Sequence, residues 1–292
     1  MLPRPLPKNC ASATRPSTDT EMHMNTTVRP AAALRHDPAL PLLEIDEPPP
    51  YAVINPDGSS PYLLLCEHAS NRIPRALGDL GLPLAERQRH IAWDIGVSAL
   101  SQHLSAALDA PLFMANYSRL VIDCNRPLHV PSLIPEVSET TVVPGNAGLS
   151  EAERQQRIDT LFHPFAKAVS RRLDQRRQQG LRTIIIGVHS FTPVYFGKLR
   201  PWHAGVLYGE AKAFGRAMTD CLAADHALCI GDNQPYDIHP DEDYTVPVHA
   251  DARGLPGALI EIRHDLIRDA QGVNAWGRRL TTCLKEMERL PF

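Results

Sequence analysis

The sequence predicts an α/β fold with a mixed, mostly parallel central sheet that is flanked by helices on both faces. Short apolar runs at 62–66, 184–188 and 259–262 alternate along the chain with longer segments of amphipathic character. Runs that are apolar at nearly every position suit strands buried on both faces of a sheet. Alternation of such strands with helices is typical of parallel sheets.

The 292 residues are expected to form a disordered N-terminal tail over 1–50 and a single α/β domain over 51–292. The tail is rich in Pro, Thr, Ser and Ala and shows little periodicity. Such a composition buries too little apolar surface to offset the entropy lost on ordering. Met22 and Met24 leave open where translation starts. The remaining length is enough for a core without metal or disulfide staples.

Each expected element has its own signal. The segment 84–108 carries apolar residues at helical spacing, and Ser150 with Glu153 forms a capping box that opens a long helix. The segments 127–146 and 231–257 are long enough to be functional loops. In order, we expect strand 62–66, helix 84–108, strands 111–115 and 120–124, helix 150–179, strands 183–188 and 203–208, helix 210–224, strand 259–262 and helix 273–290.

Composition and charge exclude several classes of function. A net charge of −3 gives no electrostatic reason to bind nucleic acid or an anionic membrane. There is no apolar run long enough for a membrane span and no secretory signal. The six cysteines lack CxxC spacing, which favours a reducing compartment without a disulfide framework. We therefore expect a cytoplasmic protein that acts on a small molecule; its oligomeric state stays open.

Histidines lie at the ends of two of the expected strands. His68 follows the strand 62–66, and His189 follows the run 184–188. Ligands of open α/β sheets bind outside the carboxyl ends of the strands. A neutral imidazole is the commonest zinc ligand, and a strand end fixes its direction. Two histidines alone do not bind zinc tightly, so a third ligand is needed.

Asp94 is the expected third ligand. It lies among apolar neighbours on the expected helix 84–108, where a carboxylate is costly to bury unless it is paired or bound to a metal. Glu67 is a rival, but in a strand it points to the face opposite His68. His90 is another rival, because it lies one helical turn before Asp94.

Glu261 is the expected general base. It lies within the apolar strand 259–262, where an acidic side chain needs a partner. Near a metal-bound water its pKa would be raised by burial and tuned by the cation. The alternative is a structural ion pair with a basic neighbour.

Three arginines lie at the ends of expected strands. Arg119 and Arg126 bracket the strand 120–124, and Arg263 ends another. The planar guanidinium suits bidentate recognition of a carboxylate, so an acidic substrate is implied if the three converge. Asp123 is placed to orient one of them.

With these residues assembled, the chain resembles the N-formylglutamate amidohydrolase family. The resemblance spans about residues 61–265, and its motifs are specific when they are taken in order. They are Cys66-Glu67-His68-Ala69-Ser70, Trp93-Asp94-Ile95-Gly96, Ser118-Arg119-Leu120-Val121-Ile122-Asp123-Cys124-Asn125-Arg126-Pro127, Gly187-Val188-His189-Ser190-Phe191-Thr192-Pro193, Asp232-Asn233-Gln234-Pro235-Tyr236 and Ile260-Glu261-Ile262-Arg263.

The resemblance implies a phosphorylase/hydrolase-like fold, shared with zinc carboxypeptidases and aspartoacylases, and hydrolysis of an N-acyl amino acid. Those relatives hold zinc with a His, an acidic residue and a second His. They bind the substrate carboxylate with an Asn-Arg pair and use a late-strand Glu as base. The residues that match, apart from the acidic ligand, are His68, His189, Asn125, Arg126 and Glu261.

The acidic ligand departs from the pattern of those relatives. Where a His-x-x-Glu pair has its glutamate, this chain has Asn71, and asparagine is a poor zinc ligand. We therefore assign the third metal contact to Asp94 and keep Glu67 and Asn71 as alternatives.

The expected reaction is hydrolysis of N-formyl-L-glutamate to formate and glutamate, as in histidine degradation, or of a similar N-acyl amino acid. One zinc ion per chain activates a water, Glu261 acts as general base and Arg119 stabilises the oxyanion. Other divalent metals suit the same ligands. The substrate contacts are expected from Asn125, Arg126, Arg263, Ser190 and Tyr236.

Two other functions stay open. One is a hydrolase of another N-acyl amino acid or small peptide amide, and the other is a non-catalytic module that binds an acidic ligand. The joint presence of His68, His189 and Glu261 favours an enzyme, because a binding module needs no base.

Overall fold

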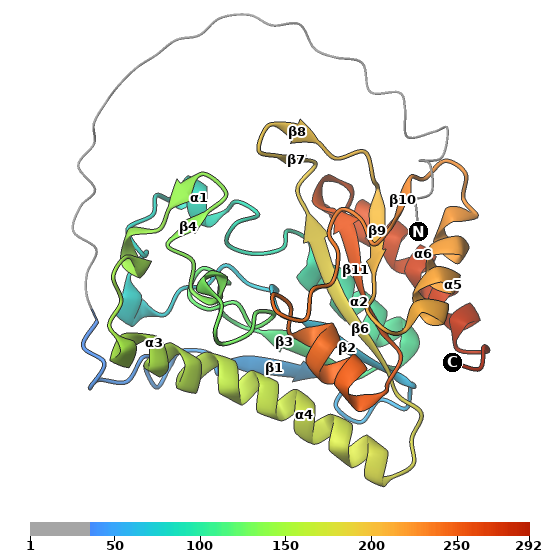
Figure 1. Cartoon of the computed structure of the whole chain (residues 1–292), viewed down its shortest axis with the longest axis horizontal. Helices are drawn as coiled ribbons and strands as arrows, with labels where there is room; N and C mark the ends of the chain where they lie inside the picture. The colour runs from blue at the N-terminus through green and yellow to red at the C-terminus, as the bar shows by residue number, and fades with distance from the viewer. Residues whose placement is uncertain (1–35) are drawn as a thin grey trace, which may run out of the picture.

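The computed structural model describes residues 36–292, which are built around a seven-stranded mixed sheet (Figure 1). Four neighbouring strands, β3, β2, β6 and β11, run parallel, whereas β1 at one edge and the pair β9–β10 at the other run in the opposite direction. The predicted mixed, mostly parallel sheet is therefore confirmed. In sheet order the strands are β1 (Tyr51–Ile54), β3 (Leu112–Ala115), β2 (Tyr62–Cys66), β6 (Ile184–Phe191), β11 (Gly257–Arg263), β9 (Ala204–Leu207) and β10 (Ile230–Asp232).

Helices cover both faces of the sheet, and the alternation of strand residues decides which side chains meet them. The even-numbered residues of β6 and β11 pack with α2, α5 and α6 in one apolar cluster, whereas Ile185 packs with α4 in another. Glu67, His189 and Glu261 therefore belong to the α4 face. The helices are α1 (Leu84–Arg87), α2 (Val97–Leu108), α3 (Glu151–Arg157), α4 (His163–Gln178), α5 (Lys212–Ala223) and α6 (Ala270–Met287).

The prediction of one helix over 84–108 is wrong for the middle of the segment. The segment contains the short α1 and then α2, and the nine residues between the two helices are irregular. Gly96 begins α2 with a φ of +87°, and a side chain there would overlap the carbonyl oxygen of Ile267. This close approach in a left-handed conformation explains the break.

The expected strand over 120–124 is also wrong. The carbonyl oxygen of Ser118 accepts the amides of Val121 and Ile122, at 2.9 and 3.4 Å, so the chain turns there. The Asp123 amide bonds to Leu133 outside the sheet. The segment is buried for another reason: Leu120, Val121 and Ile122 pack in the cluster under α4.

The long helix predicted from Ser150 begins as expected and then changes its pitch. The capping box of Ser150 and Glu153 is present. A π-helical turn, Ile158–Phe162, then joins α3 to α4. Ile158, Leu161 and Phe162 of this turn are buried in the core below the sheet.

The two long loops contain short elements of their own. In the first loop, β4 (Val137–Ser138) and β5 (Thr141–Val142) form a two-stranded hairpin. A similar hairpin of β7 (Val194–Tyr195) and β8 (Lys198–Leu199) lies outside both loops, between β6 and β9. A π-helical turn, Thr245–Ala250, lies in the second loop. The remaining short 3₁₀ turns are Arg75–Leu77, Pro131–Leu133, Pro144–Asn146, Asp251–Arg253 and His264–Leu266.

Residues 36–50, which we expected to be disordered, contact the domain. Leu42 is 2% exposed in the core, and Gln156 donates to the carbonyl oxygen of Leu40 at 2.6 Å. Tyr117 donates its hydroxyl to Pro48 at 2.7 Å. The rest of the expected tail, residues 1–35, lies outside the described residues.

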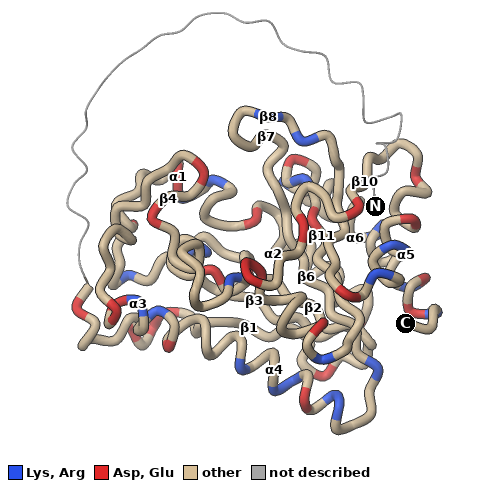
Figure 2. Tube along the Cα trace, in the orientation of Figure 1, with Lys and Arg blue, Asp and Glu red and all other residues tan. Residues whose placement is uncertain are grey.

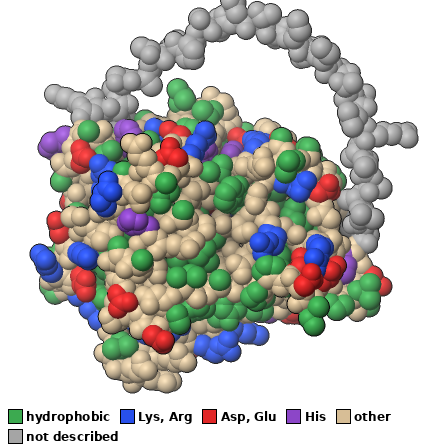
Figure 3. All heavy atoms as spheres, turned by 180° about the vertical axis from the view of Figure 1, so that it is seen from behind, with side chains coloured by type: hydrophobic (Ala, Val, Ile, Leu, Met, Phe, Trp, Pro, Cys, Tyr) green, Lys and Arg blue, Asp and Glu red, His purple; other side chains and the backbone are tan. Residues whose placement is uncertain are grey.

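The surface carries both signs of charge, with arginines gathered toward the C-terminal end of α4 (Figure 2). Seen from behind, hydrophobic side chains lie scattered between polar and charged ones (Figure 3). Over residues 36–292, no helix is long and apolar enough to cross a membrane. Cys66, Cys124, Cys221 and Cys283 are free.

Candidate active site

A cleft of about 310 Å³ opens where β2, β6 and β11 end. Its floor is made by residues at or just after the carboxyl ends of these strands, and its walls come from the two long loops. The predicted site residues that line it are His68, Asp94, Arg119, Asn125, Arg126, His189, Ser190, Tyr236 and Glu261.

His68, Asp94 and His189 converge at the bottom of this cleft, and all three are buried. Oδ2 of Asp94 lies 3.0 Å from Nδ1 of His189 and 3.4 Å from Nδ1 of His68. The two Nδ1 atoms are 3.2 Å apart. The three predicted metal ligands are thus the group of residues that could hold a metal ion in the described part of the chain.

The distances among these three atoms fit a divalent cation. Zinc ligands lie about 2.0–2.2 Å from the ion, so the corners of a tetrahedral site are about 3.3 Å apart. The donor set, two imidazole nitrogens and a carboxylate, is the one that zinc prefers in hydrolases. The surrounding carboxylates also favour positive charge at this point. Burial lowers the pKa of His189, but Asp94 and Glu67 outweigh it and raise that pKa well above its usual value.

The other nitrogen of each histidine faces a buried carboxylate. Nε2 of His68 is hydrogen-bonded to Oδ1 of Asp123 at 2.7 Å, whereas Nε2 of His189 lies 3.2 Å from Oε2 of Glu67 in an ion pair that lacks hydrogen-bond geometry. A carboxylate at Nε2 keeps the proton there and leaves the Nδ1 lone pair for a metal. Both rings therefore present Nδ1 to the same point.

Asp94 is held by groups from three segments. Its amide donates to the carbonyl oxygen of His68 at 3.0 Å, and its Oδ2 accepts the Ser190 amide at 3.1 Å. The Ser190 hydroxyl donates to Ile95 at 3.0 Å, so this residue fixes the loop that carries Asp94. Nη1 of Arg119 lies 3.5 Å from Asp94 Oδ1.

Asp123 ties an arginine to the metal ligands, as the sequence suggested. Arg119 donates to its Oδ2 from Nε at 3.0 Å and from Nη2 at 2.7 Å. Although burial alone would raise it, Arg119 and His68 hold the pKa of Asp123 well below its usual range. Asp123 therefore remains ionised at neutral pH and orients His68 and Arg119 together.

Glu261 lies beside the metal ligands with a free carboxyl oxygen. It is paired in register with His189 on the neighbouring parallel strand. Its Oε2 is buried and has no hydrogen-bond partner within residues 36–292. Burial raises its pKa to about 7, against the lowering effect of His189. A carboxyl group with this pKa can exchange a proton near neutral pH.

Asn125 and Arg126 lie on the wall of the cleft beside Asp123. Oδ1 of Asn125 accepts the Thr245 amide at 2.9 Å, which leaves the amide nitrogen as the donor end. Nη1 of Arg126 donates to Oδ1 of Asp243 at 2.9 Å and to the carbonyl oxygen of Glu242 at 2.6 Å. Asn125 and Arg126 thus present further N–H groups toward the cleft.

Arg263 is the one predicted substrate residue that the structure does not bring into the cleft. Its guanidinium donates to Asp265 at 2.8 and 3.2 Å and to the Trp202 carbonyl at 3.4 Å. Although Arg263 ends β11, its bonds to Asp265 hold its guanidinium outside the cleft. Arg263 is therefore not part of the proposed site.

The rivals for the third metal contact have other partners. Glu67 lies behind His189, and Asn71 donates to the carbonyl oxygen of Arg87 at 3.0 Å. His90 lies in the cleft wall with Nε2 3.4 Å from Glu139, and its ring stacks near His264.

The loop 233–243 forms a wall of the cleft, and it can lie there because β9 and β10 have glycines beneath it. A Cβ at Gly205 or at Gly231 would overlap the carbonyl oxygen or side chain of Gln234. The loop then carries Tyr236 into the cleft, where its hydroxyl accepts a hydrogen bond from Arg200 at 2.7 Å.

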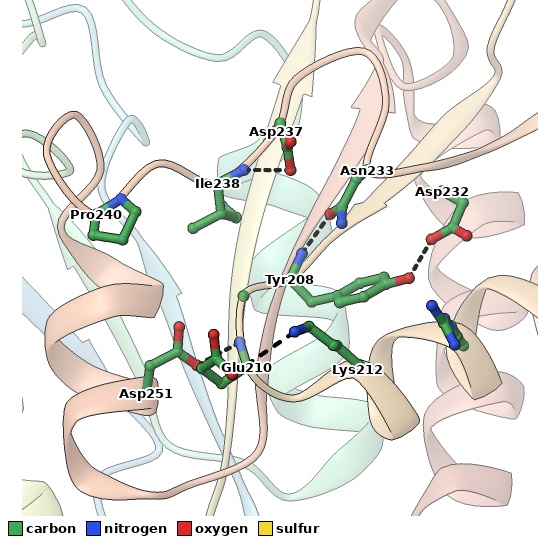
Figure 4. Close-up of a pocket in the computed structure, with 11 residues that line it drawn as sticks. Tyr208, Glu210, Lys212, Asp232, Asn233, Asp237, Ile238, Pro240 and Asp251 are labelled. Atoms are coloured by element: carbon green, nitrogen blue, oxygen red, sulfur yellow. Dashed lines mark hydrogen bonds and ion pairs between the residues drawn. The ribbon is translucent and has the colours of Figure 1, made fainter. Parts of the chain in front are cut away.

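A second hollow of about 400 Å³ lies on the other side of this loop (Figure 4). Asp237 and Ile238 line both hollows, so they form the partition. None of the ten predicted site residues lines the second hollow. Its labelled side chains are Tyr208, Glu210, Lys212, Asp232, Asn233, Asp237, Ile238, Pro240 and Asp251.

Comparisons with known proteins place the chain in a family and show the same fold in solved structures. The sequence profile of the N-formylglutamate amidohydrolase family matches residues 60–268. The crystal structure of gene product Atu2144 from Agrobacterium tumefaciens is similar with a TM-score of 0.80 and 35% identity, over 85% of this chain and 100% of that one. N-formylglutamate amidohydrolase from Ralstonia eutropha JMP134, at 18% identity and a TM-score of 0.60 over 82% and 97% of the two chains, shares the fold. Among curated proteins, none matches this chain.

Proposed function

Since this chain belongs to the N-formylglutamate amidohydrolase family, we propose that it is a metal-dependent amidohydrolase of N-formyl or other N-acyl amino acids. The observation that carries the proposal is the convergence of two imidazole Nδ1 atoms, one carboxylate oxygen and the free carboxyl of Glu261 in one cleft. The best first substrate is N-formyl-L-glutamate.

His68, Asp94 and His189 would hold one divalent cation, zinc by preference. When bound there, it supplies Lewis acidity for the scissile carbonyl and an acidified water. Among residues 36–292, these three are the group whose ligand atoms lie close enough together to hold a metal ion.

Glu261 takes the proton of the attacking water and returns it to the nitrogen of the leaving amine. Its carboxyl is buried, unpartnered at Oε2 and half-protonated near neutral pH, which suits both transfers. Arg119 stabilises the negative charge that develops on the carbonyl oxygen, because Asp123 fixes its guanidinium beside Asp94.

The substrate carboxylate is held by donors on one wall. Asn125 offers its amide nitrogen, and Arg126 offers the N–H groups that Asp243 and Glu242 leave free. Tyr236 closes the opposite side, and Ser190 acts by holding the Asp94 loop rather than by touching substrate.

A second candidate function is hydrolysis of an N-acyl amino acid with a neutral or basic side chain. The cleft is also lined by Glu139, Asp237 and Glu242. These carboxylates would repel the side-chain carboxylate of a glutamyl substrate.

The test is elemental analysis of the purified protein together with formate release from N-formyl-L-glutamate, before and after chelation. We expect about one metal ion per chain and activity that chelation removes and added zinc restores. A panel of N-formyl amino acids with acidic, neutral and basic side chains separates the two candidates. A protein that binds no added zinc, cobalt or manganese contradicts the metal-dependent mechanism.

A further inference from the structure

Glu67 is a charged side chain that has no contact with solvent. It follows β2 directly and lies on the α4 side of the sheet, behind the floor of the cleft. A buried carboxylate is stable only with partners that donate to it or balance its charge. Glu67 has two partners: the Thr245 hydroxyl, which donates to its Oε1, and the ring of His189, which forms an ion pair with Oε2 at 3.2 Å without hydrogen-bond geometry.

The two nitrogens of His189 face different groups. Nδ1 lies 3.0 Å from Asp94 and 3.2 Å from Nδ1 of His68, whereas Nε2 lies 3.2 Å from Oε2 of Glu67. A neutral imidazole carries one proton, and a carboxylate at Nε2 draws the proton to that side. His189 is then an Nδ1 donor, which is the form that the cleft requires.

A divalent cation bound here would carry two positive charges, and two buried carboxylates would be needed to balance them. Asp94 balances one of the two positive charges of a divalent cation. Asp123 is balanced by Arg119, which it binds through two hydrogen bonds. Glu67 is fully buried and pairs with no arginine or lysine of residues 36–292, so its charge can balance the second charge of the cation through His189.

Thr245 connects Glu67 to the wall that holds substrate. Its hydroxyl donates to Glu67, and its backbone amide donates to Oδ1 of Asn125 at 2.9 Å. The same support therefore fixes a metal ligand and the amide of Asn125. Thr245 is 1% exposed, so water does not compete for these bonds.

We propose that Glu67 is a positioning residue, which holds His189 as an Nδ1 donor and balances the charge of the bound cation. This inference rests on the proposed metal site and assigns Glu67 no contact with the cation itself.

Two variants separate the two parts of this role. Glu67→Gln removes the charge but keeps a carbonyl oxygen that can accept from Nε2 of His189. Glu67→Leu removes charge and acceptor at similar volume. We expect zinc affinity, measured by chelator competition, to fall about tenfold in Glu67→Gln and nearer a hundredfold in Glu67→Leu. The metal-free Glu67→Leu protein should melt lower than wild type, because the substitution leaves His189 and the Thr245 hydroxyl without their buried partner.

Proton NMR of the cobalt-loaded protein gives a readout that loss of stability would not move. Wild type should show two exchangeable, strongly shifted imidazole N–H signals, from Nε2 of His68 and of His189. Glu67→Leu should lose or broaden one, and Glu67→Gln should keep both. The matched control is Glu210→Gln, an exposed residue that should leave affinity and spectrum unchanged.

Wild-type zinc affinity in Glu67→Leu, or two unchanged N–H signals in that variant, would overturn the role of Glu67 while leaving the metal site intact. A wild-type protein that binds no metal would instead overturn the proposed function, and this inference with it. Equal losses in Glu67→Gln and Glu67→Leu would contradict the part of the role that holds His189 as an Nδ1 donor, because only Glu67→Gln keeps an oxygen beside Nε2.

Discussion

Glu261 of β11 and His189 of β6 face each other in register across two neighbouring parallel strands. Register partners point to the same face of a sheet, and adjacent strands are about 4.8 Å apart. The spacing between the expected base and a metal ligand is therefore set by the backbone hydrogen bonds of the sheet. Substitutions that keep both strands intact test the chemistry of each residue separately.

Replacement of the base should abolish turnover without releasing the metal. In Glu261→Gln we expect kcat to fall by about 10²–10⁴, because the amide cannot take the proton of the attacking water. The residue is not a ligand, so elemental analysis should still find one metal per chain. A kcat within tenfold of wild type would show that another group acts as base.

Replacement of either histidine ligand should release the metal. After dialysis, His68→Ala and His189→Ala are expected to retain less than about a tenth of the wild-type zinc, since a histidine and a carboxylate alone bind weakly. The matched control is His129→Ala, an exposed histidine of the loop 127–146 that does not line the cleft. Full zinc content in either ligand variant would contradict the assignment.

Removal of Arg126 should weaken binding of the substrate carboxylate. We expect Arg126→Ala to raise KM by about 10–100-fold, because a hydrogen bond to a charged group contributes about 1.5–3 kcal/mol. A substrate whose α-carboxylate is replaced by a neutral amide should be hydrolysed equally by both proteins. If the variant loses the same factor on both substrates, Arg126 instead supports the loop through Asp243.

Stability should fall on acidification partly through His249. Burial lowers the pKa of this histidine to about 4, whereas it is near 6.5 in an unfolded chain. The unfolded state therefore binds a proton at a higher pH than the folded state does. The contribution of His249 is present above pH 6.5 and is lost as pH falls from 6.5 to 4, by roughly 3 kcal/mol in full.

Urea unfolding at pH 7.5 and pH 5 tests this linkage. In His249→Gln, which cannot take up a proton, the loss of stability between the two pH values should be smaller than in wild type. Comparison of the two differences cancels the contributions of all other groups. An identical pH dependence in both proteins would show that His249 is protonated in the folded state.

The strand ends were predictable from the sequence because a strand buried on both faces is visible as an uninterrupted apolar run. His68 and His189 follow such runs, and the sheet brings them together. Asp94 lies with them as expected, but in a loop and not on a helix. Helical periodicity continues across 88–96, and the close approach of Ile267 that breaks it is a tertiary contact.

Partners that are distant in sequence were not predictable. Arg263 ends a strand just as the sequence suggested, yet Asp265 holds it away from the cleft. Thr245 carries no local signal, and its contact with Glu67 spans 178 positions of the chain. For Glu67 a signal exists, since an acidic residue directly after a fully buried strand requires a partner, but the sequence does not identify which one.

The cleft is built from two parts that can vary independently, the sheet and the loop 233–243 that lies over Gly205 and Gly231. The cation donors belong to the sheet, whose geometry tolerates little change, whereas the loop 233–243 rests on it only because two side chains are missing. Insertions or replacements in that loop can reshape the pocket without moving His68, Asp94 or His189. A different sequence in this one segment would therefore change which molecules fit the cleft while the proposed metal site stays in place.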